Sequence, residues 1–311
     1  MGTSFRIVLY SSDSLHAVDA AEAAFDRVEE LNEVFSDYLA SSEIGRLSMA
    51  SGSGTWTRVS EDLWRVLTDA IRISEATGGA FDVTVGALTS PWRRAMPSGR
   101  LPDVAEVNEA LTRVGYELID VDDRRRSVRL SVEAMRLDFG GIAKGYAADE
   151  ALRVLRERDI TSALIDAGGD LLLGCGPPNG YGWNIAVPGG VEDGMSVLSG
   201  LESIAVASSG ATYQYIEADG VRYSHILDPR TGMGITAERT VSVAASTGEM
   251  ADALATVVSV LGADGFEAAF ALGAVWIRVR DRSGNDYTID DRGNIPNPES
   301  SICPASRPLG N

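Results

Sequence analysis

The spacing of apolar residues in the first 115 positions predicts a strand followed by helices. Residues 5–10 alternate like a strand, and residues 15–35 carry alanine, valine and leucine at helical spacing. Ser60, followed by two acidic residues, predicts the N-cap of a second helix that ends at the glycine pair of residues 78–79. A third helix is predicted within residues 101–115, where the last glycine stops it.

The rest of the chain is richer in short β-like runs. Residues 118–137 predict a hairpin around the turn DDRRRS, residues 140–158 a helix that follows a glycine pair, and residues 250–273 two more helices. Further strands are predicted on both sides of a glycine turn in residues 162–176, and at residues 183–187, 203–210, 222–228 and 239–245. Because helices and strands do not alternate regularly, we expect the α+β class.

No internal repeat or long linker divides the chain. We therefore expect a single domain of two intimate subdomains over residues 1–290. A polar, flexible tail rich in proline, serine and asparagine is expected over residues 291–311. The 311 residues, of which 44% are hydrophobic, suffice for a full core.

Charge and composition exclude some classes of partner. The formal net charge of −18 opposes sequence-independent binding to nucleic acid or anionic lipid, which needs a basic surface. No run approaches the ~20 consecutive apolar residues of a membrane helix, and the first residues do not resemble a signal peptide. Cys175 and Cys303 are far apart and lack CxxC spacing, so neither a zinc site nor a disulfide framework is expected.

Candidate metal ligands occur in the helix predicted after residue 250. Asp252 and Thr256 stand four residues apart, so a carboxylate and a hydroxyl project from one face of that helix. Such hard oxygen ligands suit Mg²⁺, which completes its coordination with waters and phosphate oxygens. Considered alone, such a pair is more often an ordinary solvated or capped helix face.

Two glycine-rich segments could bring backbone close to a phosphate. Asp138 and Lys144 flank the glycines of DFGGIAKG, where helix N–H groups and a lysine would attract an anion. In residues 165–170, IDAGGD, the glycines permit close approach, and the Ala167 carbonyl could bind a metal. Ordinary glycine turns explain both segments equally well.

One histidine and one aromatic residue complete the candidates. His225 lies in a strand that runs into a proline-containing turn, and its pKa near neutrality makes it the natural proton acceptor, although a lone histidine is more often structural. His16 falls in the first helix, where a surface role is expected. Phe81, in GGAFDVTVGAL, could stack on a planar ring or anchor the core.

The order of these segments resembles the ApbE-type FAD:protein FMN transferases. The matching segments are MGTSFRI, FSDYLASSEIGRLS, GGAFDVTVGAL, LDFGGIAKGYAAD, LIDAGGDLLLG, YSHILDPRTGMGI and MADALATVVSVLG. They follow the family order from Met1 to about Leu261 and cover most of the chain. The resemblance implies an α+β fold related to T-fold subdomains, with FAD between the halves and Mg²⁺ beside its pyrophosphate.

The resemblance also implies a set of site residues. The catalytic residues would be His225, Asp252 and Lys144. Flavin contacts would fall on Met1, Tyr38, Ala80, Phe81, Asp82, Asp138, Lys144, His225 and Ile226. Asp252 and Thr256 would hold the metal, with Gly141, Ala167 and Ala255 giving backbone oxygens or lying close by. Asp166 stands where an asparagine-type residue is frequent, and it would add negative charge near the metal.

The implied reaction transfers FMN from FAD to a Thr or Ser hydroxyl of an acceptor protein, with release of AMP. Mg²⁺ would polarise the FMN phosphorus, Lys144 would pair with Asp138 or a phosphate, and His225 would accept the hydroxyl proton. Two alternatives stay open: a Mg²⁺-dependent FAD pyrophosphatase that releases FMN and AMP, and a non-catalytic FAD-binding protein or flavin-dependent oxidoreductase.

The resemblance bears on location as well, because proteins of this kind are often exported lipoproteins. We expect a periplasmic or extracytoplasmic protein if a leader has been removed, and a cytoplasmic one otherwise. Contact with a membrane is expected only through an N-terminal anchor outside this chain.

Overall fold

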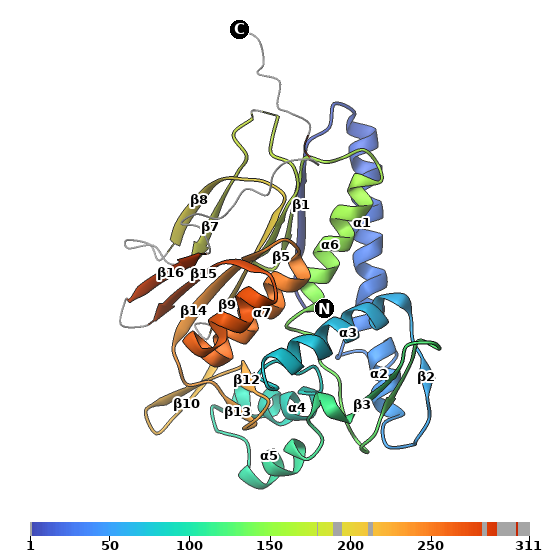
Figure 1. Ribbon diagram of the computed structural model, residues 1–311, viewed down its shortest axis with the longest axis vertical. Coiled ribbons are helices and arrows are strands. Elements are labelled where there is room, and N and C mark those ends of the chain that lie inside the picture. The colour runs from blue at the N-terminus through green and yellow to red at the C-terminus, as the bar shows by residue number, and fades with distance from the viewer. Residues whose placement is uncertain are drawn as a thin grey trace.

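Helices and strands follow one another irregularly along the chain, which confirms the α+β prediction (Figure 1). The computed structural model describes residues 2–178, 180–188, 195–210, 214–281, 285–290 and Cys303. The helices are α1 Ser14–Phe35, α2 Glu43–Met49, α3 Glu61–Ala76, α4 Gly86–Ala95, α5 Val104–Leu111, α6 Ala143–Arg156, α7 Gly248–Leu261 and α8 Phe266–Ala271. The strands are β1 Phe5–Leu9, β2 Thr57–Arg58, β3 Ile119–Asp122, β4 Ser127–Leu130, β5 Ala163–Ala167, β6 Asp170–Leu173, β7 Trp183–Pro188, β8 Met195–Leu201, β9 Ile204–Gly210, β10 Tyr215–Ala218, β11 Val221–Ser224, β12 Leu227–Asp228, β13 Met233–Gly234, β14 Arg239–Ala245, β15 Ala274–Asp281 and β16 Asp286–Asp290.

A seven-stranded antiparallel sheet in the order β1-β5-β6-β9-β14-β15-β16 forms the framework of the described residues. Its two faces bury different clusters because successive side chains of a strand point to opposite sides. In β5, Ala163 and Ile165 join the larger core with α6 and α7, whereas Leu164 packs with Trp183 and Ile185 of β7. The β7–β8 hairpin therefore covers the face opposite the helices.

Helices α6 and α7 cross so closely that glycine is required at the contact. A Cβ at Gly145 would lie 2.0 Å from the carbonyl oxygen of Gly248, which no real side chain tolerates. Asp149 of α6 also accepts the N–H groups of Gly248 and Glu249, at 2.8 and 2.9 Å, and so caps the first turn of α7. This crossing brings Lys144 of α6 next to the carboxylate of Asp252 on α7.

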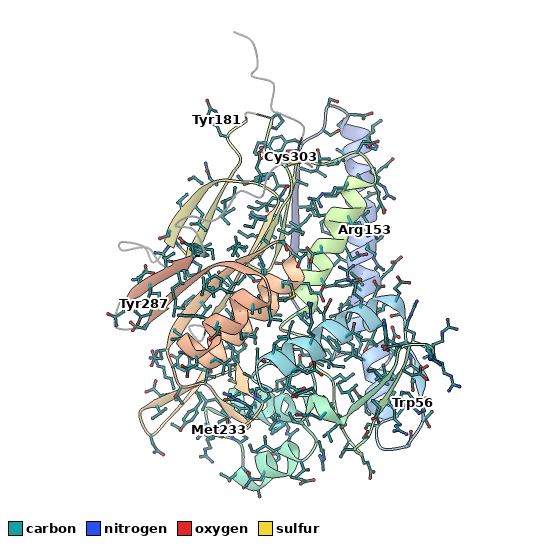
Figure 2. The ribbon with its side chains drawn as sticks, in the orientation of Figure 1. Trp56, Arg153, Tyr181, Met233, Tyr287 and Cys303 are labelled. Atoms are coloured by element: carbon teal, nitrogen blue, oxygen red, sulfur yellow. A yellow bond between two sulfur atoms is a disulfide. The ribbon has the colours of Figure 1, made fainter. Side chains whose placement is uncertain are left out.

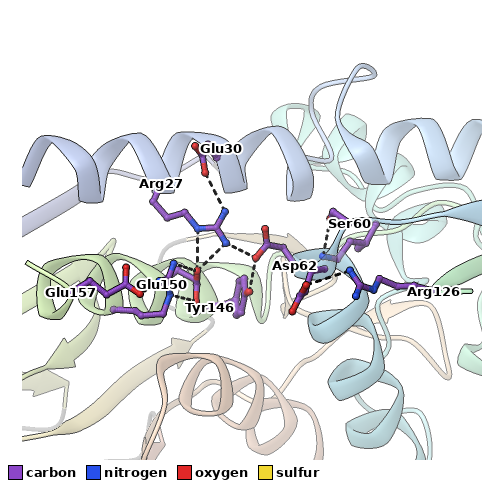
Figure 3. Close-up of polar contacts among 11 residues, drawn as sticks. Arg27, Glu30, Ser60, Asp62, Arg126, Tyr146, Glu150 and Glu157 are labelled. Carbon is purple, nitrogen blue, oxygen red and sulfur yellow. Dashed lines mark hydrogen bonds and ion pairs between the residues drawn. The ribbon is translucent and has the colours of Figure 1, made fainter. Parts of the chain in front are cut away.

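An ion-pair network links α1, α3 and α6. Arg27 of α1 donates to Glu150 of α6 at 3.0 and 2.9 Å, and its guanidinium also bonds Asp62 of α3 (Figure 3). Tyr146 donates to the same Asp62 oxygen at 2.7 Å. These contacts tie α3 to α1 and α6.

The remaining elements form a smaller region around α2, α3, α4 and α5 (Figure 1). It holds the three-stranded sheet β2-β4-β3 and the hairpins β10–β11 and β12–β13. Within it, Leu88 and Trp92 of α4 form a separate apolar cluster with Ile216 and Leu227. The helices α2 and α3 and the strand β4 instead bury their apolar side chains in the larger core. The helix α4 was not predicted, because its sequence includes Pro91 and begins at a glycine.

Cys175 and Cys303 form a disulfide, so the expectation of no disulfide was wrong. Their Cα atoms lie 5.4 Å apart although the residues are 128 positions apart in sequence. Figure 2 shows Cys303 at the end of the molecule away from Met233 of β13. Apart from Cys303, the predicted tail over 291–311 lies outside the described residues.

The segment Gly248–Ala271 has the length and hydropathy of a membrane-crossing helix, with a mean hydropathy of 1.4 over its best window. In this structure it consists of α7, a short 3-10 turn and α8. All the apolar residues of α7 from Ala251 to Val260 are buried. The composition of this segment therefore reflects its place in the core.

Candidate functional site

A cavity of about 990 Å³ opens between the large sheet, the ends of α6 and α7, and the smaller region. Several short segments line it: residues 80–82, 140–141, 168–170, 208–210 and 225–227. Lys144, Asp252 and Thr256 reach it from the two helices, and Tyr38, Arg93 and Asp138 border it elsewhere. Its volume lies at the upper end of the range of about 300 to 1,000 Å³ that is typical of small-molecule sites.

Lys144 lies at the centre of the charged part of this cavity. Its Nζ atom is 2.7 Å from Oδ1 of Asp252, 3.2 Å from Oδ2 of Asp170 and 3.0 Å from the carbonyl oxygen of Gly140. Burial alone would lower the pKa of Lys144, but the two carboxylates outweigh burial and raise it. Lys144 is therefore a permanent cation over the physiological range.

Lys144 was expected to pair with Asp138 or a phosphate; in the structure its partners are Asp252 and Asp170, not Asp138, and the phosphate stays a prediction. Asp138 instead meets Arg93, whose Nη2 atom lies 3.1 Å from Oδ2, and it accepts the N–H of Gly140 at 2.9 Å through Oδ1. Burial raises the pKa of Asp138, and the nearby Asp37 adds to the increase. The close crossing of α6 and α7 at Gly145 and Gly248 places Lys144 beside Asp252 of α7 instead.

Asp252 and Thr256 lie one turn apart on α7 and both face the cavity, as the spacing predicted. The Asp252 carboxylate is fixed by the Gly145 N–H at 3.2 Å. A Cβ at Gly141 would lie 3.0 Å from Oγ1 of Thr256 and 3.4 Å from the ring of Phe81. Glycine at position 141 thus keeps the space in front of the Thr256 hydroxyl clear.

These donors fit a hard divalent cation. Within the described part of the chain, no group of three or more His, Cys, Asp or Glu side chains is placed to hold a metal. Mg²⁺ needs few protein ligands, because it keeps waters and takes phosphate oxygens. One carboxylate, one hydroxyl and the open space at Gly141 meet that need, provided that Lys144 gives up its contact with Asp252.

His225 lies between β11 and β12, so the strand predicted over residues 222–228 is interrupted at the histidine. Its N–H and its Nδ1 atom both approach the carbonyl oxygen of Gln214, at 3.0 and 3.2 Å. A carbonyl only accepts, so Nδ1 carries the proton and Nε2 is left as a base. Burial lowers the pKa of His225, the hydrogen bond to Gln214 opposes this, and the charge of Lys144 lowers the pKa further. Because the net shift is downward from the usual value of 6.5, the neutral ring predominates at pH 7.

Three residues with predicted flavin contacts line the cavity in different ways: Tyr38, Phe81 and Asp82. Tyr38 is 66% exposed and lies under the guanidinium of Arg93, with 4.5 Å from the ring centroid to Cζ. Phe81 is buried in the large core but also lines the cavity. Asp82 accepts Thr84 N–H at 2.8 Å and Tyr116 N–H at 2.7 Å, so its carboxylate oxygens already hold the loop. Its contact with a flavin stays a prediction.

The other predicted residues fall into three groups. Ala80, Gly141 and Ile226 line the cavity. Ala167 and Ala255 are buried and adjoin the lining residues Gly168 and Thr256 in sequence, without lining the cavity themselves. Met1 lies outside the described residues. The roles of all these residues remain predictions.

Two residues of the site were missed by sequence reasoning. Asp170 closes the glycine turn after β5, accepts the Ser208 N–H at 3.1 Å and contacts Lys144. Its position at the end of IDAGGD was the available signal, but only the backbone of that turn was considered. Arg93 lies on the unpredicted helix α4 and pairs with both Asp37 and Asp138.

Asp166 pairs with the exposed Arg6 at 3.1 Å and is not among the residues described as lining the cavity.

Comparison with known proteins identifies the family. The model of the ApbE family matches residues 1–274 of this chain. The chain belongs to the ApbE family. The resemblance drawn from its sequence segments is therefore confirmed.

Two relatives of this chain share the same name. A protein named FAD:protein FMN transferase from Treponema pallidum is 32% identical over 283 residues, with 84% of this chain and 77% of the relative covered. One of the same name from Vibrio cholerae is 33% identical over 271 residues, covering 84% of this chain and 79% of the relative. The expected enzyme class, a transferase, agrees with these names.

Solved structures support the fold of this ApbE protein. The ApbE protein of Thermotoga maritima superposes with a TM-score of 0.81 at 32% identity, over 92% of this chain and 93% of that one. The flavin transferase ApbE of Vibrio cholerae gives 0.79 at 27% identity, over 93% of this chain and 94% of that one. The prediction of an ApbE-like α+β fold is confirmed.

Proposed function

We propose that this protein transfers the FMN half of FAD to a Thr or Ser hydroxyl of an acceptor protein and releases AMP. The observation that carries the proposal is that one cavity joins aromatic side chains, Phe81 and Tyr38, to the charged cluster of Lys144, Asp170 and Asp252. The aromatic side chains can stack on the flavin ring, and the charged cluster can bind a phosphate together with a metal ion. Family membership and the names of the relatives support flavin transfer.

Mg²⁺ is the proposed cofactor, held by Asp252 and Thr256. When bound, it supplies positive charge to the pyrophosphate and lowers the cost of bond cleavage. Lys144 places a second positive charge at the same end of the cavity. Together they give an acidic protein of net charge −18 a local site for a polyanion.

His225 is proposed to act as the base. The acceptor oxygen attacks the FMN phosphorus, its proton passes to Nε2 of His225, and the bond from that phosphorus to the oxygen of AMP breaks. The neutral ring, with Nδ1 held by the Gln214 carbonyl, is already in the tautomer that this step requires. A new phosphoester then links FMN to the acceptor.

The test incubates the protein with FAD, Mg²⁺ and a peptide that carries a Ser/Thr flavinylation motif. We expect the peptide to gain the mass of FMN less one water, with one AMP released per transfer. Free FMN and AMP with no gain on the peptide would establish a pyrophosphatase instead. Tight FAD binding without turnover, unchanged by a chelator, would establish a flavin carrier.

We further infer that the protein works outside the cytoplasm. The Cys175–Cys303 disulfide supports this, because disulfides persist in oxidising compartments and are rare in the cytosol. Thiol titration of protein taken from its native host under denaturing, alkylating conditions should find both cysteines protected. Two free thiols would place it in a reducing compartment.

A further inference from the structure

The ammonium group of Lys144 is shared between two carboxylates. Besides the Gly140 carbonyl, it contacts Asp252 at 2.7 Å and Asp170 at 3.2 Å. An ammonium has three N–H donors, so these contacts occupy all of them. The side chains of Asp252 and Asp170 are only 6% and 10% exposed, so water screens the interactions weakly.

The carboxylates are fixed, and the ammonium is the adjustable member of the cluster. The second oxygen of Asp252 accepts the N–H of Gly145 on α6, and the second oxygen of Asp170 accepts the N–H of Ser208 on β9. Lys144 carries its charge at the end of a flexible four-carbon stem. A new charge in the site therefore moves Nζ before it moves either carboxylate.

The cluster carries one excess negative charge, since two carboxylates face one ammonium. A divalent cation at Asp252 would repel an ammonium on the same carboxylate. Asp170 already contacts Nζ and begins a different element, β6, so it can hold Lys144 while Asp252 is occupied.

We propose that Asp170 is a positioning residue that retains the Lys144 ammonium in the cavity while a divalent cation occupies Asp252. The proposal rests on the proposed function, because it takes Asp252 as a metal ligand. On metal binding Nζ moves from Asp252 to Asp170, and it stays beside the FMN phosphate as a second positive charge. Asp170 touches neither substrate nor metal in this role, and acts through Lys144.

The test measures the Mg²⁺ affinity of the full chain with FAD, by isothermal titration calorimetry, in wild type, Asp170→Asn, Lys144→Met and the double variant. Asp170→Asn keeps an oxygen for the Ser208 N–H but no longer attracts the ammonium, so Lys144 stays on Asp252 and competes with Mg²⁺. We expect about tenfold weaker binding, a typical loss when a partner that supports a metal ligand is removed. Asp120→Asn is the control, because it removes a carboxylate that pairs with Arg129 at 2.9 Å and is not among the residues that line the cavity. It should leave the affinity unchanged.

The Lys144→Met background separates this role from a general charge effect. There Asp170→Asn should change the Mg²⁺ affinity by less than about threefold, because the residue through which Asp170 acts is gone. An equal loss in both backgrounds, or no loss in the wild-type background, overturns the role of Asp170 and leaves the metal site intact. Absence of Mg²⁺ binding by the wild type would instead defeat the proposed function together with this inference.

A second measurement serves if Asp170→Asn fails to fold, as judged by circular dichroism. In crystals of the wild type with FAD and Mn²⁺, Nζ of Lys144 should lie within hydrogen-bonding distance of Asp170 and away from Asp252. Nζ still bonded to Asp252 beside the bound metal would overturn the proposal.

Discussion

The polar side chains around the cavity differ in how many of their atoms already form hydrogen bonds within the protein. Asp82 is committed to its own loop, and Asp138 to Arg93 and Gly140. His225, by contrast, uses Nδ1 for the Gln214 carbonyl and keeps Nε2 for chemistry. Residue type and order in the sequence could indicate which residues gather here. They could not indicate partners such as Arg93 for Asp138, because these depend on how α4 docks.

Replacement of His225 tests the proton step. His225→Ala should leave FAD affinity within about threefold of the wild type and lower the transfer rate about 10² to 10⁴-fold, the usual contribution of a general base. Stopped incubations with acceptor peptide and a separate FAD titration measure the two effects. His16→Ala is the control, since His16 bonds the Arg158 carbonyl on the surface. Loss of FAD binding in His225→Ala would show that the residue holds the flavin instead.

Glu249 makes stability depend on pH. It is 3% exposed, and its Oε1 atom has no hydrogen-bond partner among the described residues. Burial, with a smaller contribution from Asp69, raises its pKa from 4.5 to about 8, although Arg65 and Arg72 oppose the increase. Between these two pKa values the folded protein holds a proton that the unfolded chain has lost. Stability is therefore full below pH 4.5 and is lost as pH rises through about 8.

Glu249→Gln should remove this dependence. Relative to the wild type, the variant should gain up to roughly 4 kcal/mol in free energy of unfolding on going from pH 5 to pH 9. Urea melts at several pH values measure the gain, and the exposed Glu267→Gln should show none. A parallel pH dependence in Glu249→Gln and wild type would contradict the assignment.

Elements whose sequence signals are local were predicted well. The N-cap of α3 is Ser60, which accepts the Leu63 N–H at 3.2 Å, as its sequence indicated. The hairpins β3–β4 and β5–β6 also follow their turn residues. The strand β15 was missed although it is largely apolar, and the strand over residues 222–228 breaks at His225 because the loop there is shaped by Gln214 and Ile235.

Arg27 tests the contact between helices. Its side chain is 18% exposed and joins Glu150, Asp62 and Glu30 across three helices (Figure 3). Arg27→Met should leave two partly buried carboxylates facing each other and lower the free energy of unfolding by about 2 to 3 kcal/mol. Arg125, whose side chain is 80% exposed, pairs with Asp122, and Arg125→Met should cost less than about 0.5 kcal/mol. Equal urea midpoints for the two variants would show that the network adds little.

Over the whole molecule, the close crossing of α6 and α7 at Gly145 and Gly248 positions the site. The sequence shows glycines at both positions, but nothing local shows that they meet. The disulfide was missed for the same reason, since Cys175 and Cys303 are brought together only by the fold. Long-range pairings of this kind cannot be read from spacing.

The disulfide should stabilise the protein without touching the site. Cys303→Ser should lower the free energy of unfolding by about 2 to 5 kcal/mol, because a long loop is no longer closed in the unfolded chain. FAD affinity should not change, since neither cysteine is among the residues that line the cavity. A reductant should lower the free energy of unfolding of the wild type by as much as Cys303→Ser does, and should leave that of the variant unchanged. A reductant-insensitive wild type would show that the bond does not form.

The central claim is that a divalent cation at Asp252 and Thr256 meets the pyrophosphate of FAD in this cavity. Anomalous scattering from crystals soaked with FAD and Mn²⁺ tests it most directly. We predict a Mn²⁺ peak within coordinating distance of the Asp252 carboxylate, Oγ1 of Thr256 and a phosphate oxygen of FAD. A pyrophosphate bound away from α7, or a peak that does not touch Asp252, would contradict the account.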